Sequence, residues 1–334
     1  MANKGKHLIE NDYTPVTYDP QYILMVNHLK KYFPIKGGLL SQTVGHVKAV
    51  DGVTFNLRRG CTMGLVGESG CGKSTTGRTI LRLSGEKTGG QVLFNGKEVY
   101  DMTPAEMREL RTKMQIIFQD PFSSLSPRLP VGEIIGEAVR EHNLVPKNEF
   151  NDYIDQVMDD CGLQPYHKTR YPHEFSGGQR QRIGIARAIV LEPDLIIADE
   201  PISALDVSIQ AQVINLLNDL RNKMGLTIMF IAHNLSVVKY FSDRIGVMYY
   251  GKLVELADSD ELFEHPLHPY TKSLLSAIPY PDPHHEKHRQ RIEYKPLKEH
   301  DYSVNKPSLR EIKPGHFINC NDEEFERYKK ELGL

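Results

Sequence analysis

Residues 67–75 read Gly-Glu-Ser-Gly-Cys-Gly-Lys-Ser-Thr, which satisfies the pattern G-x-x-x-x-G-K-[ST]. A short apolar run, residues 62–66, precedes this stretch and is predicted to be a strand. The residues that follow, 74–83, place Ile80 and Leu83 on one face of a predicted helix. A glycine-rich loop between a strand and a helix N-terminus binds phosphates through backbone N–H groups. The stretch therefore predicts a nucleoside triphosphate site, and the flanking elements argue against a chance glycine-rich turn.

The loop also supplies side chains for the phosphates and their metal ion. Lys73 is placed to reach the β- and γ-phosphates, and the Ser74 hydroxyl to ligate Mg²⁺. The predicted nucleotide-binding residues are Gly67, Glu68, Ser69, Gly70, Cys71, Gly72, Lys73, Ser74 and Thr75.

A second predicted anion site begins at residues 176–179, Ser-Gly-Gly-Gln. These residues open a predicted helix whose apolar positions Ile183, Ala186 and Ile189 or Val190 fall at helical spacing. A helix N-terminus with two glycines has the electrostatics of a phosphate site. One nucleotide cannot occupy two such distant sites unless the protein pairs with a second subunit. An ordinary N-capped helix is the alternative interpretation.

Two carboxylates follow the buried-strand pattern of residues 195–198. Asp199 is predicted to hold Mg²⁺, as aspartates at such strand ends do in P-loop enzymes. Glu200 is placed to orient and deprotonate the attacking water, which indicates hydrolysis rather than transfer to an alcohol. A further apolar strand, residues 227–232, ends at His233, where a γ-phosphate contact belongs. The alternative interpretation is that His233 is a surface histidine without a catalytic role.

The order of these motifs resembles the ATP-binding subunits of ABC transporters over residues 22–280. The resemblance implies that ATP and Mg²⁺ bind and that each motif has the family's role. It assigns residues 67–75 to the Walker A loop, Asp199 and Glu200 to Walker B and the catalytic glutamate, Asp206 to the D-loop, and His233 to the switch histidine. It assigns Gln119 to the Q-loop, where it senses Mg²⁺ and couples to the membrane partner, and Ser176, Gly177, Gly178 and Gln179 to the signature acting on the partner's ATP. Tyr32, with Phe33 as a possible substitute, is similar to the aromatic residue that stacks on adenine.

Finer features resemble the oligopeptide and dipeptide permease ATPases, and their F-type rather than D-type subunit. Residues 36–38 with 44–53 look like the long loop between the first strands of that group, and residues 118–128, 171–175 and 265–275 are likewise similar. The resemblance implies a heterodimer with a second ATP-binding subunit, two transmembrane permease subunits, an extracytoplasmic solute-binding protein, and a place at the cytoplasmic face of the membrane. Importers of nickel or other small solutes share most of these strings, so the solute stays open.

The predicted fold is α/β, a P-loop NTPase of the RecA-like kind with a mostly parallel sheet. We expect an antiparallel β subdomain with hairpin turns at 58–60 and 94–97, and an inserted helical subdomain at about 102–175. Helices are expected from Pro104, after the N-cap Thr103, and over 150–158. The expected division is an N-terminal extension at 1–21, the ATP-binding domain at 22–265 and a C-terminal extension at 266–334. Its last helix, 322–332, is mostly charged and expected at the surface.

Composition agrees with this prediction and argues against nucleic acid as a partner. The 334 residues are 40% hydrophobic, and the net charge of −2 provides no basic field for nucleic acid. No apolar run approaches the ~18–20 residues that span a bilayer, so membrane association is expected through partner subunits. The cysteines lack C-x-x-C spacing and are expected to be free thiols, Cys71 being the most reactive without nucleotide.

Three alternatives stay beside the main prediction. A soluble ABC-type ATPase acting on ribosomes or DNA usually carries two cassettes or a large inserted arm, and this chain shows neither. A module that holds ATP without turnover is disfavoured by Glu200 and His233. The His-rich segment at 284–300 is expected to be a solvated linker, with a metal site at His284 and His288, spaced i, i+4, as the alternative.

Overall fold

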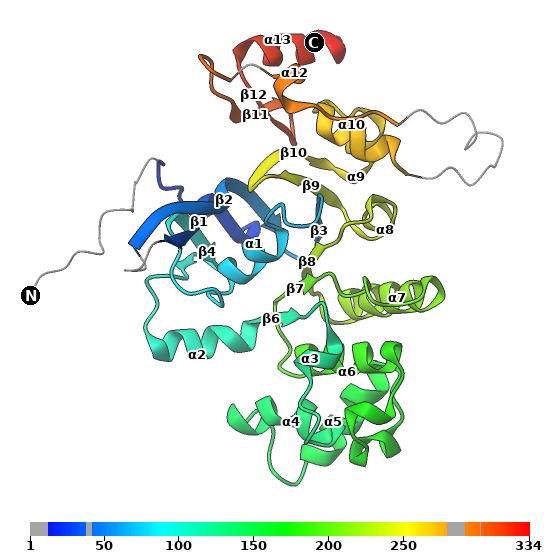
Figure 1. The fold of residues 1–334 in the computed structure, drawn as a ribbon. Helices are drawn as coiled ribbons and strands as arrows, with labels where there is room; N and C mark the ends of the chain where they lie inside the picture. Colours follow the sequence, from blue (N-terminus) through cyan, green and yellow to red (C-terminus); the bar gives the residue numbers. More distant parts are fainter. Residues whose placement is uncertain (1–12, 38–41, 279–290, 301) are drawn as a thin grey trace, which may run out of the picture. The chain divides into compact units, whose positions relative to one another are not determined.

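The computed structural model describes residues 13–37, 42–278, 291–300 and 302–334 (Figure 1). Contacts divide the chain into two units. Unit 1 holds the described residues up to Leu57, Thr62–Tyr100 and those from Ala232 onward, and unit 2 holds Arg58–Cys61 and Asp101–Ile231. The metal-site hypothesis at His284 and His288 and most of the N-terminal extension lie outside the described residues.

An antiparallel sheet opens unit 1, as the sequence predicts. Its strands lie in the order β2-β1-β4-β5, with bounds β1 Tyr22–Gly37, β2 Gln42–Arg58, β4 Gly89–Phe94 and β5 Lys97–Glu98. The hairpin predicted at 94–97 is confirmed, because β4 pairs with β5 and both Asn95 (φ 48°) and Gly96 (φ 82°) are left-handed. Two left-handed residues are what a tight hairpin needs to match the twist of its strands.

Two expectations for this region are wrong. Residues 44–53 do not form a long loop but belong to β2, which neighbours β1 in the sheet. The turn at 58–60 exists, with Cys61 N–H donating to Arg58 O, but it does not close a hairpin. The strand before it, β2, and the strand after it, β3 (Thr62–Val66), lie in different sheets.

A second group of strands in unit 1 lies in the order β11-β12-β10-β9-β3. Here β3 and β9 (Arg244–Tyr249) are parallel, whereas β10 (Lys252–Asp258), β12 (His316–Cys320) and β11 (Ser308–Lys313) pair antiparallel. The helices of this unit are α1 Lys73–Ile80, α8 Leu235–Phe241, α9 Ser259–Glu264, α10 Pro269–Ser276, α12 Pro296–Glu299 and α13 Asp322–Glu331.

The last helix is not simply a surface helix. Tyr328 of α13 is buried in a cluster with Leu267, Ile312, Ile318 and Cys320. Spacing explains the result, since Phe325, Tyr328 and Leu332 fall at i, i+3 and i+7 and share one face, while most of the charged residues are exposed and Glu324 is buried.

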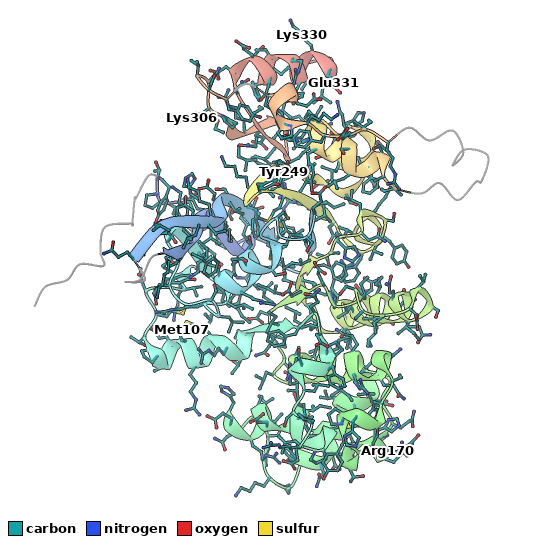
Figure 2. The ribbon with its side chains drawn as sticks, viewed as in Figure 1. Met107, Arg170, Tyr249, Lys306, Lys330 and Glu331 are labelled. Atoms are coloured by element: carbon teal, nitrogen blue, oxygen red, sulfur yellow. The ribbon has the colours of Figure 1, made fainter. Side chains whose placement is uncertain are left out.

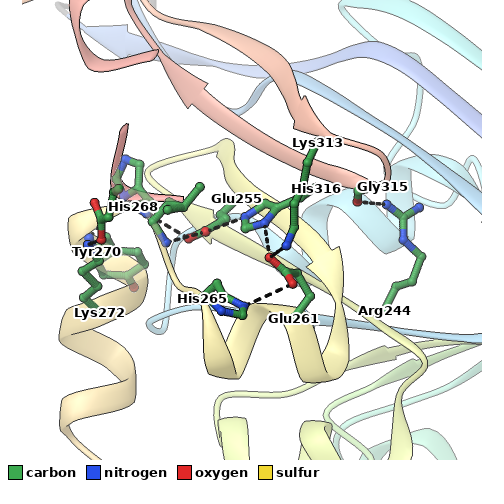
Figure 3. A network of polar contacts seen from close by, with 12 residues as sticks. Arg244, Glu255, Glu261, His265, His268, Tyr270, Lys272, Lys313, Gly315 and His316 are labelled. Atoms are coloured by element: carbon green, nitrogen blue, oxygen red, sulfur yellow. Dashed lines mark hydrogen bonds and ion pairs between the residues drawn. The ribbon is translucent and has the colours of Figure 1, made fainter. Parts of the chain in front are cut away.

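Buried polar contacts join the C-terminal strands to β10 (Figure 3). Glu255, fully buried in β10, accepts hydrogen bonds from the N–H groups of Leu267 (2.8 Å) and His268 (3.1 Å). His316 of β12 lies with Nε2 2.9 Å from Glu255 Oε1 and Nδ1 3.0 Å from Glu261 Oε1 (Figure 3). A buried carboxylate is stable only when its oxygens are satisfied in this way, so these contacts specify how β12 and the start of α10 dock on β10.

Unit 2 is built on three parallel strands in the order β8-β7-β6. Their bounds are β6 Met114–Ile117, β7 Leu195–Asp199 and β8 Thr227–Ile231. Its helices are α2 Pro104–Lys113, α3 Pro121–Ser124, α4 Val131–Glu141, α5 Phe150–Asp160, α6 Gly177–Ile189 and α7 Val207–Met224, with 3₁₀ turns η1 Pro165–Thr169 and η2 Pro172–Glu174.

The helical prediction for residues 102–175 is correct for most elements and wrong at one. Thr103 caps α2 in a capping box with Glu106, and α5 covers the predicted 150–158. Residues 114–117 are instead the strand β6, whose backbone pairs in parallel with β7. The run Met-Gln-Ile-Ile is too short for its periodicity to reveal which state it adopts.

Candidate functional site

The P-loop, residues 67–72 of unit 1, depends on two glycines. Gly67 has φ +150°, and a Cβ there would lie 2.2 Å from the carbonyl oxygen of Met248. Gly72 has φ +106°, and its Cβ would lie 2.1 Å from the carbonyl oxygen of Ala49. Neither backbone contact can give way, so only glycine lets the loop pass between β2 and β9.

Lys73 places a positive charge inside this loop. Its side chain is buried, 4% exposed, and its Nζ donates to the carbonyl oxygens of Gly67 (2.7 Å) and Glu68 (3.0 Å). Lys73 is also the first residue of α1, whose N-terminus adds partial positive charge. Ser74 and Thr75 follow, half-buried, on the first turn. Together these features make a site for a polyphosphate with a hydroxyl ligand at its edge.

Two contacts from the C-terminal half of unit 1 hold the same loop. The Tyr270 hydroxyl accepts a hydrogen bond from the backbone N–H of Glu68 at 3.0 Å, and Gly251 N–H donates to Cys71 O at 2.8 Å. Tyr270 is 2% exposed, and burial raises the pKa of its phenol, so its hydroxyl stays neutral. Sequence reasoning missed both contacts. The segment 265–275 stood out by resemblance, but no local pattern reveals a partner 202 residues away.

The expectation that Cys71 is the most reactive thiol is wrong. Its side chain is buried, and burial raises the pKa of the thiol in spite of the nearby Lys73. Because the thiolate is the nucleophile, a raised pKa lowers reactivity. All four cysteines are free, as predicted, and Cys61 is the one that is not buried.

His233 and Tyr32 also belong to unit 1. His233 is exposed and directly follows Ala232, whose N–H donates to Leu65 O (3.1 Å) of β3, the strand that leads into the P-loop. Tyr32 donates its hydroxyl hydrogen to Asp51, and Lys48 Nζ lies 5.3 Å from its ring centroid. The adenine-stacking role of Tyr32 stays a prediction.

In unit 2 the structure brings together Gln119 and Glu200, which are 81 positions apart. Gln119 Nε2 donates to Glu200 Oε2 at 3.1 Å. This contact orients the residue predicted to activate water.

The backbone at Glu200 is strained. Its φ is +48°, which is uncommon for a residue with a side chain, and its N–H donates to Ile231 O at 3.0 Å. Such strain tends to concentrate at functional sites because it aims a side chain. Asp199, one residue earlier, ends β7 and is 1% exposed. The strand therefore presents a buried carboxylate and an accessible one in succession.

The residues predicted to form the signature lie at the start of α6. Ser176 is its N-cap, its Oγ accepting from Gln179 N–H at 3.3 Å, and Gln179 Oε1 accepts in return from Ser176 N–H at 3.1 Å. The helix is thus N-capped, and this does not exclude a phosphate role, since a first turn has four N–H groups without helical partners. Gly178 lies against α7, where a Cβ would meet Ile209 Cγ2 at 2.6 Å. The signature and the D-loop, with Asp206 at the N-cap of α7, are therefore neighbours.

Sequence reasoning missed a contact from α6 to the Q-loop region. Arg187 donates to Ser124 O at 2.6 Å, and its guanidinium lies 5.8 Å from the Phe118 ring centroid. Arg180 lies over the Phe122 ring at 4.9 Å. Both arginines stand on α6, so that helix contacts the segment that carries Gln119. The spacing of two arginines in a charged helix does not predict which distant segment they contact.

Within residues 13–37, 42–278, 291–300 and 302–334, no cluster of three or more His, Cys, Asp or Glu could hold a metal ion. Across the same ranges, none of the helices has the length and apolar character needed to cross a membrane.

Comparison with known proteins gives two family matches. Residues 50–203 match the model described as ABC transporter, and residues 254–305 match the oligopeptide/dipeptide transporter C-terminal region. The chain is 55% identical to the oligopeptide transport ATP-binding protein OppF of Bacillus subtilis, covering 92% of this chain and 98% of the relative. It is 52% identical to the dipeptide transport ATP-binding protein DppF of Lactococcus lactis, covering 87% and 93%.

Solved structures agree on the fold. CbiO1 of Clostridium perfringens, part of the ABC transporter complex CbiONQ, matches with a TM-score of 0.62 and 27% identity, covering 73% of this chain and 91% of that one. The ATP-binding cassette MJ0796, solved as a dimer bound to ADP and phosphate, matches with a TM-score of 0.62 and 26% identity, covering 71% and 98%. The α/β P-loop fold predicted from the sequence is thus confirmed. With 55% identity to a relative over nearly the whole of both chains, the chain belongs to the ABC transporter ATP-binding proteins, an ATPase family.

Proposed function

We propose that this chain binds and hydrolyses ATP to power the import of oligopeptides or dipeptides, as one of a pair of ATPase subunits. The contact that carries the catalytic part is the Gln119–Glu200 hydrogen bond of 3.1 Å, which orients a carboxylate for water activation. The peptide part is supported by relatives named for oligopeptide and dipeptide transport, and by the match of residues 254–305.

Binding begins at the P-loop. Lys73, whose ammonium contacts two loop carbonyl groups, would reach the β- and γ-phosphates, and the backbone of residues 67–72 would surround them. Tyr32 would stack on adenine. These residues supply binding and orientation, which is most of what phosphoryl transfer to water requires from a protein.

The residues proposed for Mg²⁺ fit that ion chemically. Ser74 offers a hydroxyl, Gln119 an amide oxygen and Asp199 a buried carboxylate, all hard oxygen donors of the kind Mg²⁺ prefers. When bound, the ion would neutralise charge on the phosphates. Asp199 would hold it partly through water.

Glu200 would accept a proton from the attacking water while the water oxygen forms a bond to the γ-phosphorus. The bond to the bridging oxygen then breaks, and ADP and phosphate leave. His233 would contact the γ-phosphate and stabilise the charge that develops there.

The second ATPase subunit completes the mechanism we propose. Ser176, Gly177, Gly178 and Gln179 would contact the γ-phosphate of ATP on that subunit, and Asp206 would lie at the contact between the two chains. The pair would close on ATP and reopen after hydrolysis. Two transmembrane permease subunits would hold it at the cytoplasmic face of the membrane, receiving solute from an extracytoplasmic binding protein. Residues 22–265 would form the ATP-binding domain and 266–334 the C-terminal extension.

The test is reconstitution of this chain with a second ATPase subunit, transmembrane permease subunits and a solute-binding protein from the same organism. Peptides of two to five residues should stimulate ATP hydrolysis, whereas Ni²⁺ should not. Stimulation by Ni²⁺ alone would support the nickel-import alternative and contradict the peptide assignment. The alternative of an ATPase acting on ribosomes or DNA predicts stimulation by ribosomes or DNA instead.

A further inference from the structure

A cavity of about 890 Å³ lies in the C-terminal part of unit 1. Residues from the β9–β10 turn and from 294–307 line it, among them Tyr249, Tyr294, Tyr302 and Lys306, and Figure 2 labels Tyr249 and Lys306. We call it the aromatic cavity. Its volume falls in the range of small-molecule pockets, about 300–1,000 Å³, and none of the motifs of ATP hydrolysis belongs to its wall.

Aromatic rings form much of this wall. The ring centroid of Tyr294 lies 5.1 Å from that of Tyr249, 5.8 Å from that of His268 and 5.7 Å from that of His300. His300 in turn stacks on Tyr302 at 4.9 Å with an interplanar angle of 18°. Such rings can make stacked and edge-to-face contacts with a planar aromatic ligand.

One wall residue has an unused polar atom. The His300 side chain is 2% exposed, and its Nδ1 lies 2.5 Å from Glu324 Oε1 and 2.9 Å from the Tyr302 hydroxyl. Its Nε2 is buried and has no hydrogen-bond partner among the described residues. A buried polar atom without a partner costs free energy, and a ligand in the cavity reaches this one only when the surrounding rings shift.

The charge of the wall is positive. Lys252 and Lys306 line the cavity, whereas no Asp or Glu is among its lining residues. Both lysines are exposed, and within the described part of the chain neither ammonium pairs with a carboxylate. The cavity therefore favours an anion.

We propose that the aromatic cavity binds a small planar aromatic anion and that Tyr270 couples its occupancy to the P-loop. The ring of Tyr270 lies 4.4 Å from that of Tyr249 and 5.5 Å from that of Tyr294, centroid to centroid, so two wall residues pack on it. Its hydroxyl holds the N–H of Glu68. A ligand that shifts Tyr249 or Tyr294 thus changes a contact of the phosphate loop, and the coupling is reciprocal. The coupling rests on the proposed binding of ATP, whereas the site itself does not.

Two sources of this chemistry are a nucleoside monophosphate and a peptide with an aromatic side chain and a free carboxylate. The probes are GMP and the dipeptide Phe-Phe. The control compounds are guanosine, which lacks the phosphate, and Phe-Phe amide, which lacks the carboxylate. Calorimetric titration uses the full chain carrying Lys73→Ala, so that the P-loop does not contribute. One probe is expected to bind with Kd below ~1 mM, and the control compound that lacks its anionic group is expected to bind at least about 10-fold more weakly. Absence of binding by both probes overturns the proposal.

Matched lysine variants locate the binding. Lys306→Ala is expected to weaken the bound probe about 5-fold or more, because it removes one charge from the wall. Lys330→Ala removes an exposed lysine of α13 outside the cavity, also labelled in Figure 2, and should change nothing. Equal affinities in the two variants overturn the assignment.

Tyr270→Phe tests the coupling, since it keeps the ring and removes the hydroxyl. In the otherwise unmodified chain, the probe should change ATP affinity about 3-fold or more, and in Tyr270→Phe this change should vanish while the probe still binds. A probe that binds without changing ATP affinity overturns the coupling. If the unmodified chain failed to bind ATP, the proposed function would fail, and the titration in the Lys73→Ala chain would still decide the cavity.

Discussion

Glu200 is the residue whose chemistry and backbone are most specific to hydrolysis. Replacing it with Gln keeps its size and a hydrogen-bonding partner for Gln119 but removes the base. We expect ATP to bind as before while turnover falls about 10²-fold or more. Nucleotide affinity and steady-state hydrolysis of the assembled complex are the two measurements.

The matched control for this variant is Glu109→Gln, which changes an exposed glutamate of α2 in the same unit. It should leave both affinity and turnover unchanged. Hydrolysis near the unmodified rate in Glu200→Gln would show that another group activates the water.

At the scale of elements, two of the three glycines of α6 have contrasting surroundings. A Cβ at Gly178 would meet Ile209 Cγ2 of α7 at 2.6 Å, whereas at Gly184 no atom lies within 4 Å. Gly184→Ala should therefore stabilise the chain by about 1 kcal/mol through helix propensity and raise Tm. In Gly178→Ala the clash of the new Cβ with Ile209 of α7 should cancel this stabilisation. The variant should also lower ATPase activity, because the clash displaces the signature from the D-loop. Equal Tm values and activities for the two variants would contradict this.

Some elements could be predicted from local sequence and others could not. Thr103 with Glu106, and Asn95-Gly96, each specify a cap or a turn within a few residues, and both predictions are confirmed. The short strand β6 could not be separated from its helical neighbours, because what makes it a strand is pairing with β7, about 80 positions later. The middle of β2 is a second case, since its sequence resembled a loop but forms a strand beside β1.

Considering the whole molecule, His268 should make stability depend on pH. Burial, together with the charge of His300, lowers its pKa from 6.5 to about 3, with Glu324 acting in the opposite direction. Between these values the unfolded chain binds a proton that the folded chain does not, so stability falls as pH falls below 6.5. At pH 5 this should cost about 2 kcal/mol relative to pH 7. Urea unfolding at the two pH values measures it.

His268→Asn provides the comparison, since an Asn side chain can still accept from Tyr270 N–H as an N-cap but does not titrate. The difference in unfolding free energy between pH 7 and pH 5 should shrink in this variant. An undiminished difference would mean that other groups carry the pH dependence.

The assembly of two ATPase subunits is tested by Ser176→Arg. The α6 N-terminus has the electrostatics of a phosphate site, but the mechanism we propose assigns it to ATP on the other subunit. The variant should bind ATP with nearly unchanged affinity as a lone subunit and abolish hydrolysis at the site formed with the partner's P-loop. A loss of lone-subunit binding as large as the loss of complex activity would place the signature on its own chain's nucleotide.

By itself, the sequence determined the α/β class, the predicted phosphate-binding loop, the order of the motifs and the family, because each motif consists of residues that are close along the chain. The tertiary structure alone decided which distant residues meet: Gln119 with Glu200, Arg187 with the Q-loop segment, and Tyr270 with Glu68 N–H. It also reversed the expectation for Cys71, since burial rather than motif sets the pKa of a thiol. Local patterns encode backbone conformation, whereas these contacts arise only when packing brings remote segments together.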